Sequence, residues 1–133
     1  MNDRELLERF EDGTLPNESF HHEDHVRVAF LYLSKYAVLD SLERFSAALR
    51  RFAARHGRAG LYNETITWAY ILLIRERMAR AKHKGTWREF KAKNQDLFDR
   101  KRNVLKKYYR DETLASDLAR HTFVFPDKTV ARG

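Results

Sequence analysis

The chain has 133 residues, which is the length of one ordinary domain, and 43% of them are hydrophobic, enough to exclude a disordered chain. It contains no cysteine, and this excludes disulfide bonds, thiolate metal ligands and a cysteine nucleophile. Lysine and arginine outnumber aspartate and glutamate by 26 to 19, and the formal charge of +7 is a reason to consider anionic partners.

The first predicted element is an acidic amphipathic helix over residues 3–11, a composition unlike that of a secretory signal peptide. The longest apolar run, residues 69–74, is far shorter than the stretch of about 20 residues that crosses a membrane. We therefore expect a cytoplasmic protein without a membrane partner.

A second helix is predicted over residues 21–36, where Val26, Ala29, Phe30 and Leu33 recur at helical spacing and form one apolar stripe. A stripe of this kind faces a core and leaves the rest of the helix to solvent. At about 100° per residue His22 falls within this stripe and faces the core, His25 lies at its edge, and Asp24 points to the opposite side.

The third predicted helix covers residues 40–56. It begins at Asp40, which heads a capping-box pattern with Glu43, and it ends before Gly57, a glycine that follows a basic last turn. The fourth, over residues 63–82, is apolar on nearly every side, so we expect it to be packed by neighbours on several faces.

The remaining helices are predicted over residues 87–98, 103–110 and 112–121, followed by an extended tail from about residue 122. Short connections favour antiparallel neighbours. The sequence therefore predicts an all-α bundle of six to seven helices with a hydrophobic central helix, in a single domain over residues 1–133.

Three of the six histidines lie at the start of the second helix, in the segment FHHEDHVR. His22 and His25 are three residues apart, so they share one side of the helix, and neutral imidazole is the commonest nitrogen ligand of metals. The spacing predicts that both bind one ion, with His21 and Asp24 as further candidates. A helical histidine pair can equally hydrogen-bond its neighbours, and this structural alternative stays open.

The start of the fourth helix supplies a second set of candidates. Asn63 can cap the helix, and Glu64 begins a mostly apolar face. Since a carboxylate in a partly dry pocket can serve as a general base or bind a cation, Glu64 is a candidate base or metal ligand. Tyr62 and Thr67 add polar atoms nearby. The plain alternative is that all four stabilise the helix start.

Four strings, FHHEDHVRVAFLYL, LRRFAARHG, LYNETITWAYILLI and YYRDETLASDLARHTFVFPD, resemble a family of small bacterial proteins, most of them without an assigned function. Sequences of this family pair a His-x-x-His-Val-Arg segment with a Tyr-His-Glu-Thr-Ile-Thr segment. The similarity extends from about residue 15 to residue 127.

The resemblance implies that His22, His25 and residues 62–67 belong to one site, and that this site binds a metal. It implies no particular reaction. Asn63 stands where the family usually has histidine. The ion would then be held less tightly, or by the Asn63 oxygen or Glu64 instead, or the metal function would be lost.

The positive charge is concentrated away from the histidines, because residues 71–133 carry a formal charge of +9 and residues 1–70 a charge of −2. Residues 75–110 contain 14 basic and 4 acidic side chains. Basic helices usually present solvated faces, but such a surface also suits nucleic acid or an acidic partner. The strongest patch consists of Arg100, Lys101, Arg102, Lys106 and Lys107.

We therefore expect a protein that binds a divalent metal ion, such as Zn, Fe, Mn or Ni. Whether it is also an enzyme that acts on a small polar or anionic molecule stays open at this point. The predicted ligands are His22, His25, Asn63 and Glu64, with Glu64 as the alternative general base. The second hypothesis is a binding module for nucleic acid or an acidic partner that uses the 75–110 face, with a purely structural histidine cluster.

Overall fold

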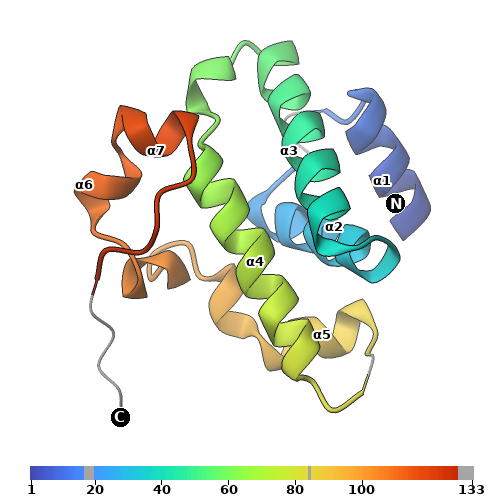
Figure 1. Cartoon of the computed structure of the whole chain (residues 1–133). Helices are drawn as coiled ribbons and strands as arrows, with labels where there is room; N and C mark the ends of the chain where they lie inside the picture. The colour runs from blue at the N-terminus through green and yellow to red at the C-terminus, as the bar shows by residue number, and fades with distance from the viewer. Residues whose placement is uncertain (17–19, 84, 129–133) are drawn as a thin grey trace.

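The computed structural model describes residues 1–16, 20–83 and 85–128, and within them every regular element is helical (Figure 1). This confirms the predicted all-α class. The α-helices are α1 Asp3–Asp12, α2 His22–Lys35, α3 Val38–Arg55, α4 Glu64–Arg80, α5 Trp87–Lys93, α6 Asp111–Leu114 and α7 Asp117–His121. In the described residues, short 3₁₀ helices are also present: η2 Ala59–Leu61, η3 Gln95–Phe98 and η4 Val104–Lys107.

The first four α-helices lie within about two residues of their predicted bounds, because long apolar stripes define them. The predicted start of the third helix at Asp40 is wrong, since α3 begins at Val38. Asp40 lies inside the first turn, where its carboxylate accepts from Arg44 Nε at 3.1 Å instead of capping the helix. At this position the carboxylate also interacts favourably with the helix dipole.

The second half of the chain is more broken than predicted. The helix expected over residues 87–98 ends at Lys93, and the side chain of the C-cap residue Asn94 donates to the Phe90 carbonyl oxygen at 2.8 Å. The segment expected to be helical over 103–110 forms only η4, which Asn103 starts by accepting from Leu105 N. Short polar side chains that hydrogen-bond the nearby backbone compete with a continuous helix, and this is the physical reason for both interruptions.

The helix predicted over residues 112–121 is likewise divided, into α6 and α7. Ser116 separates the two, and its hydroxyl oxygen accepts from Ala119 N at 3.1 Å as the cap of α7. Residues 122–128, where the extended tail is predicted, have no regular secondary structure. The rest of the tail, 129–133, lies outside the described residues.

Helix α4 runs through the middle of the molecule and packs against α2, α3 and α7 (Figure 1), as expected for the central helix. Its face toward the C-terminal segment carries Thr65, which is fully buried. The Thr65 hydroxyl donates to the Thr122 carbonyl oxygen at 2.8 Å and accepts from Val124 N at 3.1 Å. The extended tail is thus fastened to the central helix.

In the part of the chain that the structure describes, no helix is both long enough and apolar enough to cross a membrane.

Candidate functional site

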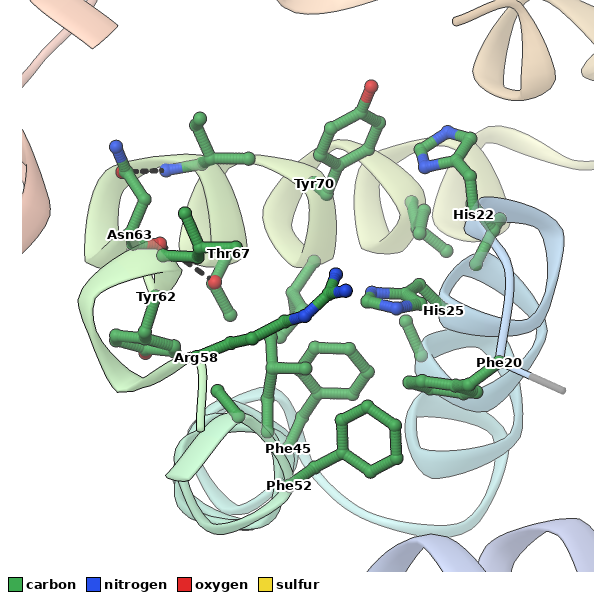
Figure 2. Close-up of a pocket in the computed structure, with 18 residues that line it drawn as sticks. Phe20, His22, His25, Phe45, Phe52, Arg58, Tyr62, Asn63, Thr67 and Tyr70 are labelled. Atoms are coloured by element: carbon green, nitrogen blue, oxygen red, sulfur yellow. Dashed lines mark hydrogen bonds between the residues drawn. The ribbon is translucent and has the colours of Figure 1, made fainter. Parts of the chain in front are cut away.

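A cavity of about 350 Å³ lies between α2, α3 and α4 (Figure 2). It is at the small end of the range of roughly 300–1,000 Å³ that is typical of ligand pockets. Most of its lining is aliphatic or aromatic. The lining side chains are Phe20, His22, His25, Val26, Ala29, Phe45, Leu49, Phe52, Ala53, Arg58, Leu61, Tyr62, Asn63, Ile66, Thr67, Tyr70, Ile71 and Ile74.

His22 is the first residue of α2 and is half-buried at one end of the cavity. Its Nε2 lies 2.8 Å from the Leu97 carbonyl oxygen, and its ring is 5.4 Å from the Tyr70 ring in an edge-on arrangement. Because a carbonyl can only accept, Nε2 is the protonated nitrogen. In the tautomer that makes this bond, Nδ1 is the acceptor nitrogen.

His25 lies one turn further along α2, and its ring stacks on Phe20 with a centroid distance of 4.1 Å. Among the described residues, neither ring nitrogen has a hydrogen-bond partner, and the imidazole faces the cavity (Figure 2). The pKa of His25 is lowered from 6.5 to about 4, first by burial and then by repulsion from His22 and Arg100. His25 is therefore neutral at pH 7, with one donor and one acceptor.

Arg58 is a site residue that the sequence reasoning missed. It follows Gly57, which ends α3 in the left-handed conformation at φ +69°. The Arg58 side chain extends from this turn across the cavity toward His25 (Figure 2). Arg58 is exposed, so its guanidinium lies at the open side. Within the described residues it has no ion-pair partner, whereas the neighbouring Arg50 pairs with Glu64.

The predicted candidates at the start of α4 are occupied by structural contacts. Asn63 Oδ1 accepts from Ile66 N at 2.9 Å and Asn63 Nδ2 donates to the Leu114 carbonyl oxygen at 2.8 Å. Both ends of the Asn63 amide are therefore engaged. The Thr67 hydroxyl donates to the Asn63 backbone carbonyl oxygen at 2.8 Å, which leaves only acceptor capacity toward the cavity.

Glu64 is not among the side chains that line the cavity. Its carboxylate accepts a hydrogen bond from the Tyr62 hydroxyl and lies 3.9 Å from Arg50 Nη1. Burial and this hydrogen bond raise the pKa of Tyr62 to about 12, so the phenol stays protonated. The Glu64 carboxylate is therefore engaged by Tyr62 and Arg50, of which Tyr62 itself lines the cavity.

The two remaining candidates near the histidines belong to the start of α2. His21 is the N-cap residue and is exposed, and Asp24 accepts from His21 N at 3.0 Å. Neither lines the cavity. Their contacts are those of a helix N-terminus, in which a carboxylate in the first turn satisfies a free backbone donor.

The predicted metal ligands are only partly brought together. His22 and His25 line one cavity, but over residues 1–16, 20–83 and 85–128 no three His, Cys, Asp or Glu side chains gather as a metal-binding group. A tetrahedral site needs four ligands, usually three of them from the protein in catalytic centres. The two histidines supply half of such a set, and the metal site stays a prediction.

The predicted basic patch divides into two exposed turns. Asp99 caps the first turn by accepting from the backbone nitrogens of Lys101 and Arg102 at 3.0 Å, and Arg100 shares that turn. Lys106 and Lys107 lie in η4. Since the charge of Arg100 contributes to the lowered pKa of His25, the first turn lies within electrostatic reach of the cavity. Nucleic-acid binding by these residues stays a prediction.

Comparison with models of protein families, with curated proteins and with solved structures finds no match to this chain. The cavity and its side chains are therefore the basis for the functional argument.

Proposed function

We propose that this protein binds a small organic anion in the cavity between α2, α3 and α4. The observation that carries the proposal is the convergence of the Arg58 guanidinium and the His25 imidazole on a cavity with otherwise mostly apolar walls (Figure 2). Few polar groups in an apolar pocket are typical of sites for small molecules, in which those groups set the ligand's orientation.

Electrostatics favours an anion over a neutral or cationic ligand. Arg58 is always protonated, and the described lining contains no carboxylate that would neutralise it. Arg100 adds positive potential near His25, and the excess of basic residues after residue 70 extends it. A charge-assisted hydrogen bond from Arg58 to an anion is stronger than a hydrogen bond between two neutral groups.

A thermal-shift and calorimetric screen tests this proposal. The probes are small carboxylates, sulfonates and alkyl phosphates, each compared with a neutral amide or alcohol of the same size. We expect an anion to bind while its neutral counterpart does not, and we expect Arg58→Gln to weaken binding by tenfold or more. Arg4→Gln removes the same charge from an exposed site outside the cavity and should leave binding unchanged. Lack of binding by every anion would refute the proposal.

A metal ion is the second candidate ligand, because His22 has the outer contact that metal-binding histidines commonly show. Its Nε2 donates to the Leu97 carbonyl oxygen, and this orients Nδ1 as a potential ligand. Elemental analysis of untagged protein, purified without chelator or nickel resin, and titration with Zn, Fe, Mn and Ni test this candidate. His22→Ala should abolish any stoichiometric binding and His83→Ala should not. Absence of metal in both measurements would remove it.

A further inference from the structure

We propose that the anion is a monocarboxylic acid with a hydrocarbon body, an inference that rests on the proposed function and names the ligand class of that site. Its carboxylate would pair with Arg58 beside His25, and its hydrocarbon body would fill the space between α3 and α4. The cavity of about 350 Å³ is large enough for such a body.

The polar end of the cavity suits a carboxylate. Arg58 presents a planar fork of donors that matches the two oxygens of a carboxylate. The His25 ring faces the same space (Figure 2) and can donate one ring N–H to a carboxylate oxygen. Arg58 is the one arginine or lysine side chain in the described lining, so a monoanion is neutralised there. A phosphate dianion would keep an uncompensated charge inside a partly apolar site.

The interior of the cavity suits a hydrocarbon. Its walls come from Val26 on α2, Leu49 and Phe52 on α3, and Ile66 and Ile71 on α4. These side chains can satisfy neither a hydroxyl nor a second carboxylate. A ligand that carried such a group into the interior would lose hydration there without replacement, which costs affinity.

Besides Tyr62, whose hydroxyl donates to Glu64, two hydroxyl-bearing side chains line the cavity, and they do not change this conclusion. Tyr70 donates its hydroxyl proton to Asn103 Oδ1 at 2.9 Å, and Thr67 donates to the Asn63 carbonyl oxygen. Figure 2 shows the Tyr70 hydroxyl directed away from Arg58 and His25. Neither offers a free donor to a second anionic group of the ligand.

The test is a series of straight-chain carboxylates from butanoate to dodecanoate, titrated calorimetrically into the full chain at pH 7. Each methylene group that enters the cavity should tighten binding about fourfold, until the chain outgrows the available space. Octylphosphate tests the head group, because it carries a phosphate on a chain of the same length, and octanedioate tests the effect of a second carboxylate. Both should bind at least tenfold more weakly than octanoate.

Two variants of α3 localise the effect. Ala53 lines the cavity and the adjacent Ala54 does not, and neither is fully buried. Ala53→Leu should weaken octanoate binding at least tenfold and butanoate binding less, because the added side chain occupies the space needed by the longer body. Ala54→Leu adds the same atoms to the outer face of α3 and should leave both affinities unchanged.

The outcomes separate this inference from the proposed function. Affinity that is independent of chain length, or octylphosphate that binds as tightly as octanoate, would overturn the monocarboxylate class and leave an anion site in place. An equal loss of octanoate affinity in the Ala53 and Ala54 variants would indicate that the hydrocarbon body lies outside the cavity. That result would also overturn the inference. If no carboxylate, phosphate or sulfonate binds at all, the proposed function fails as well.

Discussion

Acid should destabilise the ligand-free protein through His25, and this prediction tests the description of the cavity without any ligand. In the unfolded chain, His25 takes up a proton near its ordinary pKa of 6.5, whereas in the folded protein burial and neighbouring positive charge lower that pKa to about 4. Between these two values the unfolded state binds more protons than the folded state. The free energy of unfolding therefore falls as the pH falls through this window.

The magnitude follows from the size of the pKa shift. Each unit of difference is worth about 1.4 kcal/mol, so this single group removes up to about 3 kcal/mol between pH 6.5 and pH 4. That is a large share of the roughly 5–15 kcal/mol by which a domain is usually stable. Repulsion from His22 and Arg100 contributes to this shift, and the Arg58 guanidinium lies across the cavity from the His25 ring (Figure 2). All of them oppose its protonation.

The assay is urea unfolding at intervals between pH 7 and pH 4, in wild type, His25→Gln and His83→Gln. His25→Gln loses the stacking on Phe20 and starts from a different stability, so the pH slope is the quantity to compare. We expect a shallower slope in His25→Gln, and the wild-type slope in the variant of exposed His83. Identical slopes in wild type and His25→Gln would refute the argument that His25 is held neutral by burial.

Two further substitutions test the turn that positions the site and the fastening of the tail. Gly57→Ala should cost about 1 kcal/mol in urea unfolding because the left-handed φ of +69° is unfavourable for alanine, whereas Gly60→Ala, at an ordinary φ with open space around it, should be close to neutral. Equal effects would contradict the strained-turn argument. Thr65→Val should cost about 1–3 kcal/mol and speed amide exchange over residues 122–128, since it leaves two backbone partners unsatisfied. Thr67→Val, which removes a bond inside α4 only, should cost less and leave the tail protected; faster exchange there would count against the role of Thr65.

The sequence predicts the first half of the fold well because its information there is local. Apolar residues at helical spacing define the buried faces of α2 and α3, and the uniformly apolar stretch defines α4 as the central helix. The second half is harder because Asn94, Asn103 and Ser116 end or divide helices through side-chain hydrogen bonds to the backbone. The spacing of apolar residues carries no information about such hydrogen bonds.

For the site, the sequence correctly predicts that His22 and His25 lie beside the core, because their positions relative to the apolar stripe of α2 determine which way their side chains face. It cannot show that Asn63 is fully engaged, since one of its partners is the Leu114 carbonyl oxygen, 51 residues away. Arg58 was missed for a similar reason. Gly57 was a signal in the sequence, because a glycine at the end of a helix predicts a tight turn that fixes the direction of the next residue. The approach of the Arg58 side chain to His25, however, depends on how α3 packs against α2.

The most direct test of the central claim is solution NMR of the full chain with octanoate at pH 7. We predict intermolecular nuclear Overhauser effects between the chain protons of octanoate and the methyl groups of Ile66 and Ile71, with chemical-shift changes at His25. In Arg58→Gln these effects should weaken at the same ligand concentration. Binding without contacts to these methyl groups, or contacts confined to another surface, would contradict the claim that this cavity holds the anion.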